Sequence, residues 1–233
     1  MRLLPIALIF FAAAFQTRAA DAVFERARAM YASLKSYQDT GTIVQQFASS
    51  EQRHSFTTRY KAPKHFYFEF NKDGGDRFVI WSEGEVFHTW WKSIGAQQDY
   101  ARGQGVQAFL ASDYVTSGSS MKIPGLLFAQ AGLQGAFAHF ADPVVKGMES
   151  IEGHECYRVE GIAKDVYGGT GREVNVRPMT VWIDASSLLI RKIFEDAAKG
   201  TAPVSAIRVT TTFEPQANPA LEDARFQFAA PAK

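Results

Sequence analysis

Cysteine is almost absent from this chain, because Cys156 is the only one among its 233 residues. One cysteine cannot form an internal disulfide, and none stands near the end of the apolar leader, so we expect no lipid anchor on the protein. Cys156 lies in an alternating segment, where cysteine is more often a small buried residue than a reactive thiol. The fold must therefore be held together by its apolar core.

A surplus of charge of either sign is also missing. The chain has 25 Lys and Arg residues against 24 Asp and Glu residues, and its formal charge falls from +1 to −1 without Arg2 and Arg18 of the leader. A protein that binds nucleic acid needs a basic field that displaces counterions from the phosphates. We therefore expect no nucleic-acid partner.

Spacings typical of metal ligands and of catalytic groups are absent as well. The five histidines include no His-x-x-x-His pair and have no cysteine partner at ligand spacing, so we predict neither a metal nor another cofactor. Residues 168–172 are rich in glycine but lack the Gly-Lys-Ser/Thr ending of a phosphate loop. Ser119 and Ser120 do not lie in a Gly-x-Ser-x-Gly elbow. These absences argue against an enzyme and make a hydrolase the least favoured alternative.

The one long apolar run is confined to the first twenty residues. Arg2 is followed by an apolar stretch from Leu3 to Phe15, and Thr17-Arg18-Ala19 places small residues at the −3 and −1 positions of a cleavage site. The run is too short for a stable membrane span, and a plain N-terminal anchor is the rival interpretation. We predict a signal peptide over residues 1–20, cleaved near Ala19 or Ala20, and a single periplasmic domain over residues 21–233 without stable membrane insertion.

Aromatic residues are abundant, because they make up 13% of the chain and 19 of them are phenylalanine. In a protein without disulfides, so many rings indicate a large β core or an apolar cavity. Apolar residues recur at helical spacing from Asp21 to Lys35, which predicts an amphipathic helix with Asp21 as its N-cap. Alternating or β-branched segments then predict strands over residues 40–47, 55–60, 64–71, 77–81, 85–91, 155–161, 178–184, 188–195 and 204–214.

The first strands form a meander with an aromatic face. Residues 64–71 alternate strictly, with Phe66, Phe68 and Phe70 on one side. Tight turns join them to residues 77–81, which carry Phe78 and Ile80, and then to residues 85–91. For this last strand two inner sets stay open, either Val86, His88 and Trp90 or Phe87 and Trp91.

Between residues 103 and 142 the pattern is helical or irregular. Pro124 stands near the start of a predicted helix, which two glycines weaken further along. The apolar residues of this helix include Leu127, Phe128 and Phe137. We interpret residues 126–140 as a movable helical lid over the aromatic face.

Several stretches resemble the periplasmic LolA/LolB-type lipoprotein-sorting proteins. The opening helix ends in Leu34-Lys35-Ser36-Tyr37, and Gly153-His154-Glu155-Cys156-Tyr157-Arg158-Val159 is similar to a strand of that family. Met179-Thr180-Val181-Trp182-Ile183-Asp184, continuing to Leu189-Ile190-Arg191-Lys192-Ile193, is similar to one of its hairpins. The ending Phe226-Gln227-Phe228 with Pro231 is similar to its terminal motif.

The resemblance implies a mainly β fold with a few helices, namely a half-open, strongly curved antiparallel β-barrel with an N-terminal helix and a helical lid. It also implies that acyl chains of a lipid or lipoprotein bind inside, and that an arginine in the barrel controls the lid. Arg191 and Arg208 lie on predicted strands and are the candidates for that role. The residues expected to line the apolar site are Phe66, Phe68, Phe70, Phe78, Ile80, Trp90, Leu127, Phe128, Phe137 and Trp182.

Two other interpretations stay open at this point. In the simpler interpretation, the aromatic face is an ordinary β core that the first helix covers. In the other, the same fold senses envelope stress or binds an envelope partner protein. Trp81, Trp90 and Trp91 would then be contact residues, because exposed tryptophan is enriched at binding hot spots.

Overall fold

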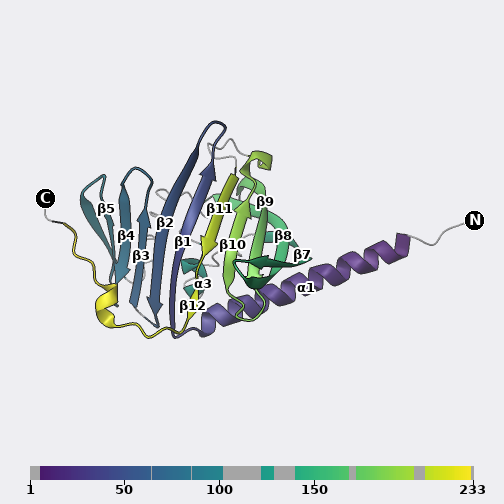
Figure 1. Ribbon diagram of the computed structural model, residues 1–233, viewed down its shortest axis with the longest axis horizontal. Helices are drawn as coiled ribbons and strands as arrows, with labels where there is room; N and C mark the ends of the chain where they lie inside the picture. The colour runs from purple at the N-terminus through teal and green to yellow at the C-terminus, as the bar shows by residue number, and fades with distance from the viewer. Residues whose placement is uncertain are drawn as a thin grey trace, which may run out of the picture.

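The computed structural model of the protein describes residues 6–63, 65–84, 86–101, 122–128, 140–167, 172–201 and 208–231, with the backbone alone at 6–19, 101, 165–167 and 172–175. Twelve strands in this part of the chain belong to one antiparallel sheet (Figure 1). They are β1 (Ser36–Gln46), β2 (Glu51–Lys61), β3 (His65–Asn71), β4 (Arg77–Ser82), β5 (Val86–Trp91), β6 (Ala96–Ala101), β7 (Phe140–Ile151), β8 (His154–Tyr167), β9 (Arg172–Asp184), β10 (Ile190–Glu195), β11 (Arg208–Phe213) and β12 (Gln216–Ala217).

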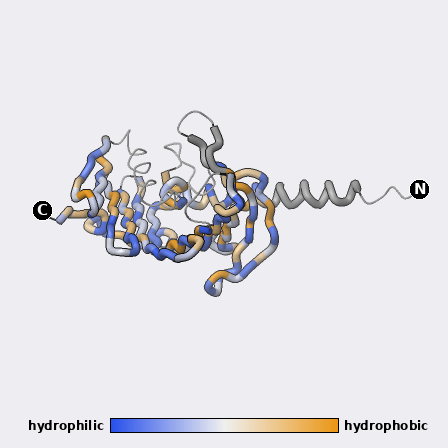
Figure 2. The backbone as a smooth tube through the Cα atoms, turned by 90° about the horizontal axis from the view of Figure 1, so that it is seen from above, coloured by the Kyte–Doolittle hydropathy of each residue, from blue (hydrophilic) through white to orange (hydrophobic). Residues whose placement is uncertain are grey.

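The sheet is open rather than closed into a full barrel. Its order is β6-β5-β4-β3-β2-β1-β11-β10-β9-β8-β7, with β12 beside β1, and the described parts of β6 and β7 do not pair with each other. Seen from above, the sheet curves into a trough (Figure 2). The short helix α3 (Pro124–Leu127) packs with the residues on the inner, concave face. The predicted fold class, a mainly β open antiparallel sheet with an N-terminal helix, is confirmed.

Helix α1 (Ile6–Ser33) begins earlier than the expected N-cap at Asp21, because the apolar leader continues into it without a helix-breaking residue. In the part of α1 whose side chains are described, Ala20 is fully buried. Further along, the ring of Phe24 lies 5.2 Å from that of Phe140 in β7. Near the end of α1, the Tyr31 hydroxyl accepts a hydrogen bond of 3.1 Å from the Ile190 amide in β10. These contacts fix α1 to the right-hand half of the sheet in Figure 1. Within the described residues, no helix has the length and hydropathy that a membrane span requires.

Strands β6 and β7 are additions to the predicted set. β7 occupies the end of the region expected to be helical, and it pairs with β8 through two register shifts. Asp142 and Gly147, at or beside these shifts, have φ angles of 51° and 132°. Such bulges interrupt the period-2 alternation of a strand, which hides it in the sequence. Of the predicted lid over residues 126–140, the structure describes residues 126–128, which end α3, and Phe140, which belongs to β7 and not to a helix. Phe137 lies outside the described residues.

Close packing on the concave face requires a glycine in β1. A Cβ atom at Gly41 would lie 2.1 Å from Cζ of Phe56 and 2.4 Å from the carbonyl oxygen of Thr212. The Phe56 ring in turn packs against Phe213 and Phe68, with centroid distances of 5.5 Å and 6.3 Å. Gly41 therefore gives the aromatic cluster the room to lie directly on the backbone of β1.

We expect Gly41→Ala to lower the free energy of unfolding by about 2 kcal/mol, because Phe56 and the backbone of β11 must both move to accept a methyl group. Urea denaturation of the purified protein measures this difference. Gln46→Ala, at an exposed position of the same strand, serves as the control and is expected to change stability little. Equal stability of Gly41→Ala and wild type would contradict the close approach.

Candidate functional site

The alternation of β2 to β5 places an aromatic set on the concave face of the trough. Cross-strand neighbours are Phe70 with both Phe56 and Phe78, Phe66 with Tyr60, and Phe68 with Ile80. Each of these side chains is at most 8% exposed, and all belong to one apolar cluster that includes residues of α1 and α3. The concave face therefore offers a continuous aromatic and aliphatic wall.

Phe128, directly after α3, joins this helix to the wall. Its ring meets those of Tyr60, Phe66 and Phe87 edge-on, with centroid distances of 5.3 Å, 5.2 Å and 5.8 Å. The three rings come from β2, β3 and β5. Leu126 and Leu127 are buried in the same cluster. A helix of four residues thus covers the aromatic part of the trough and inserts one ring between three strands.

A buried ion pair connects α3 to the other half of the sheet. Lys122, two residues before α3, donates to Oε1 of Glu195 at 2.7 Å, and Arg177 donates to the same oxygen at 2.8 Å. The side chains of Lys122, Arg177 and Glu195 are only 12%, 11% and 6% exposed. The two cations lower the pKa of Glu195 and so keep it ionised despite its burial. We call these three residues the α3 tether.

Seven of the predicted lining residues come together on the concave face, namely Phe66, Phe68, Phe70, Phe78, Ile80, Leu127 and Phe128. Two others do not. In β5 it is Phe87 and Trp91 that face inward, so Trp90 lies on the convex face with Trp81. This settles the open choice for that strand and corrects the placement of Trp90.

Trp182 also lies on the convex face, because its neighbours Val181 and Ile183 take the inward positions in β9. Its indole nitrogen donates to Oε2 of Glu149 at 2.9 Å, and the Lys192 ammonium lies 4.7 Å from its ring centroid. Trp182 therefore joins an outer polar cluster rather than the apolar wall.

Neither arginine predicted to control a lid contacts α3 in the described part of the chain. Arg191 lies beside the β9–β10 turn, where its Nε and a terminal nitrogen donate to Oδ2 of Asp184 at 3.2 Å and 3.1 Å. Arg208 is exposed at the start of β11. The α3 tether was not predicted from the sequence, because Arg177 and Glu195 lie on strands that carry several other charged side chains.

A buried carboxyl group lies at the base of the concave face, next to the end of α1. Oδ2 of Asp39 accepts a hydrogen bond of 2.7 Å from the Tyr37 hydroxyl, and Oδ1 accepts one of 3.1 Å from the Thr58 amide. Burial raises the pKa of Asp39 to about 6, although these hydrogen bonds act in the opposite direction. Asp39 is therefore a charge kept in the core by two hydrogen bonds and no cation.

Two observations concern catalytic and metal-binding chemistry in the described part of the chain. Burial raises the pKa of the Cys156 thiol to about 11, so this side chain is protonated at neutral pH. Among the residues that the structure describes, no three His, Cys, Asp or Glu side chains lie close enough together to hold a metal ion.

Comparison with known proteins yields structural relatives only. No protein-family model and no curated protein matches the chain. Solved structures do match, among them MucB with a TM-score of 0.52 and 14% identity. That alignment covers 91% of this chain and 64% of the MucB chain, so this chain spans a little under two thirds of that relative.

Two further matches have lower structural scores. The lipoprotein LppX of Mycobacterium tuberculosis has a TM-score of 0.49 and 13% identity, over 88% of this chain and 98% of LppX. The LolA superfamily protein NE2245 of Nitrosomonas europaea has a TM-score of 0.34 and 11% identity, over 90% and 97%. The likeness to MucB shows a shared fold, which in this chain is an open antiparallel sheet with an N-terminal helix and the inner helix α3, as predicted.

The raised pKa of Asp39 predicts an unusual dependence of stability on pH. The folded carboxyl group binds its proton more tightly than the unfolded one, whose pKa is 3.8, so this group makes stability fall as pH rises from 4 through about 6. The loss amounts to about 3 kcal/mol above that range.

We expect Asp39→Asn to remove this fall. Urea unfolding at pH 4, 5, 6 and 7 measures it, and the difference between variant and wild type isolates Asp39 from the other carboxyl groups. Parallel pH profiles for the two proteins would contradict the assignment.

Proposed function

We propose that the protein is an exported, non-enzymatic binding protein that holds acyl chains of a lipid or lipoprotein against the concave face of its sheet. The observation that carries the proposal is the continuous aromatic wall of β2 to β5, against which the four-residue helix α3 packs. In the same proposal, residues 1–20 are removed near Ala19 or Ala20, and residues 21–233 act in the periplasm as one domain.

The energetics of an apolar wall support this function. Each methylene group moved from water to such a surface contributes about 0.8 kcal/mol, so a chain of a dozen carbons binds without any specific polar contact. The ring of Phe128 already occupies the space between Tyr60, Phe66 and Phe87. An acyl chain that displaces this ring would find the same three aromatic contacts.

The α3 tether supports a role for α3 as the movable element, controlled by Lys122 instead of Arg191 or Arg208. Lys122 is the tether residue on the α3 side, whereas Arg177 and Glu195 both belong to the sheet. Without the Lys122 ammonium, Glu195 keeps its hydrogen bond to Arg177. α3 is therefore free to be released while the sheet retains a paired carboxylate.

Partner binding is the second candidate function. MucB, the relative with a TM-score of 0.52, also has a solved complex with MucA of Pseudomonas aeruginosa. The tryptophans that first suggested this function give it little support, because Trp81 and Trp90 are only 5% and 7% exposed.

Leu127→Glu is expected to weaken the binding of a fluorescent fatty acid to the delipidated protein at least tenfold, because it places a carboxylate on the apolar face of α3. Fluorescence titration measures the affinity. Ile94→Glu, at a side chain that is 61% exposed, is the control and should bind like wild type. No uptake by wild type, or equal uptake by both variants, would count against the proposed site.

Lys122→Met is expected to speed the uptake of the same fatty acid several-fold, because it releases α3 from Glu195. Stopped-flow fluorescence measures the rate. Lys199→Met removes another ion pair, between Lys199 and Asp196 at 2.9 Å, whose lysine is 72% exposed, and serves as the control. An unchanged rate for Lys122→Met would mean that α3 does not gate the site.

A further inference from the structure

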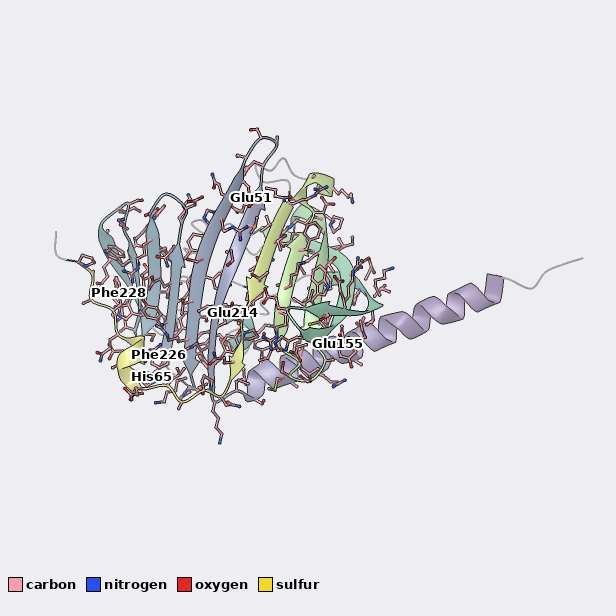
Figure 3. The ribbon with its side chains drawn as sticks, viewed as in Figure 1. Glu51, His65, Glu155, Glu214, Phe226 and Phe228 are labelled. Carbon is pink, nitrogen blue, oxygen red and sulfur yellow. The ribbon has the colours of Figure 1, made fainter. Side chains whose placement is uncertain are left out.

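The C-terminal segment from Leu221 to Pro231, which we call the strap, lies across the convex face of β3 to β5. In Figure 3 it passes below the lower ends of β2 and β3, with Phe226 close to His65 and Phe228 higher beside the outer strands. Phe226 is fully buried among Tyr67, Val79, Trp81 and Trp90. The strap therefore fills an aromatic groove on the face opposite the proposed lipid site.

Phe228 extends the contact along the groove. Its ring centroid lies 5.0 Å from that of Trp81 and 5.4 Å from that of Trp90. The Arg77 guanidinium lies 5.2 Å from the same ring. Phe226 ends a short 3-10 helix (Asp223–Phe226), and the backbone is extended at Gln227. The groove thus takes two aromatic side chains spaced two residues apart at the point where the helix gives way to extended chain.

Side chains rather than a strand ladder hold the strap in place. Within the described residues, the hydrogen bonds donated by its backbone amides stay inside the strap, from Arg225 to Glu222 and from Gln227 to Ala224. Lys61 adds an ion pair with Asp223 at 2.7 Å, and its ammonium also donates to the Leu221 carbonyl at 3.2 Å. Because no strand of the sheet pairs with the described backbone of the strap, the strap can leave without breaking a ladder hydrogen bond of the sheet.

The charges of the strap fit the groove imperfectly. Lys61, Arg59 and Arg77 line the groove, and of these Arg77 is neutralised by Glu69 at 2.7 Å. The Arg59 guanidinium reaches only the Arg225 carbonyl of the strap, at 3.5 Å, and its Nε, like that of Arg77, is buried without a hydrogen-bond partner among the described residues. Burial, together with the like charge of Arg225, lowers the pKa of Arg59. An acidic side chain would suit the position of Arg225 better.

Beyond the strap the groove continues with the same character. A hollow of about 450 Å³ adjoins Pro231 and is lined by Lys72, Arg77, Lys92 and Trp90, together with Asn71, Gly75 and Asp76. The Asp76 carboxylate accepts hydrogen bonds from the Trp91 indole and from the Ser93 amide. The hollow therefore presents two lysines, an arginine already paired with Glu69, the Asp76 carboxylate and the ring of Trp90.

We propose that this convex groove is a docking site for an extended acidic-aromatic segment of a partner protein, for which the strap is a displaceable occupant in the same chain. The partner segment carries two aromatic residues in the pattern aromatic-x-aromatic, with a carboxylate directly before the first of them. Its rings take the places of Phe226 and Phe228, and its carboxylate pairs with Arg59.

The test uses labelled peptides of the sequence 221–231 and the full-length protein. One peptide is native, one carries Arg225→Glu, and one carries Phe226→Ala with Phe228→Ala. The receiving proteins are wild type and a full-length Phe226→Ala/Phe228→Ala variant, whose groove is vacated. Fluorescence anisotropy measures each dissociation constant.

The Arg225→Glu peptide, called the acidic peptide, is expected to bind the Phe226→Ala/Phe228→Ala protein at least tenfold more tightly than the native peptide binds it. The acidic peptide is also expected to bind this variant at least tenfold more tightly than it binds wild type, where the strap competes for the groove. The peptide without rings is expected not to bind. Equal affinity of the acidic peptide for both proteins would place its site elsewhere, and equal affinity of the acidic and native peptides would overturn the role of Arg59.

A second measurement does not depend on the vacated variant folding. Arg225→Glu in the full-length protein is expected to raise the melting temperature by about 2 °C, because it replaces a like charge beside Arg59 with an opposite one. An unchanged or lower melting temperature would overturn the charge argument. If wild type forms a dimer and the Phe226→Ala/Phe228→Ala variant does not, the groove binds a second copy of this chain. That result would overturn the proposal of a different partner protein.

Discussion

The structure depends on one constraint, the strict alternation of β3, whose two faces are both buried. Phe66, Phe68 and Phe70 point into the trough, while Tyr67 lies on the convex face in a second aromatic cluster. Because a shift of one residue would exchange the two faces, the pairing of β3 with β2 and β4 is fixed by packing on both sides. The site on the concave face and the groove on the convex face therefore share strands β3, β4 and β5.

This shared wall explains why each face needs its own cover. An antiparallel sheet commonly leaves one face to solvent, but here Val79 and Trp81 of β4 are as well buried as Phe78 and Ile80. α3 covers the concave side, and the strap covers the convex side. In the described part of the chain, α3 is held by buried aliphatic side chains, the ring of Phe128 and the α3 tether, and the strap by Phe226, Phe228 and the ion pair of Lys61 with Asp223.

The sequence predicted the elements whose periodicity is intact. Phe66, Phe68 and Phe70 were placed on the correct face because β3 alternates without a bulge. β7 was missed because its bulges near Asp142 and Gly147 break that period. In β5, Trp90 and Trp91 are adjacent, so composition alone could not say which ring faces inward, and pairing with β4 decided it. The α3 tether joins Lys122 to Glu195 across 73 residues, a contact that no local pattern carries.

The place of the strap after the strands in the sequence sets the order in which the convex face can be completed. Tyr67, Val79 and Trp81 are synthesised long before Phe226, which packs among them. During the early stages of folding, this aromatic surface must face solvent or a chaperone, even after β3 and β4 have paired. Closure of the convex face is thus a late event, and the absence of residues 221–231 would leave an apolar surface exposed on the outside of the sheet.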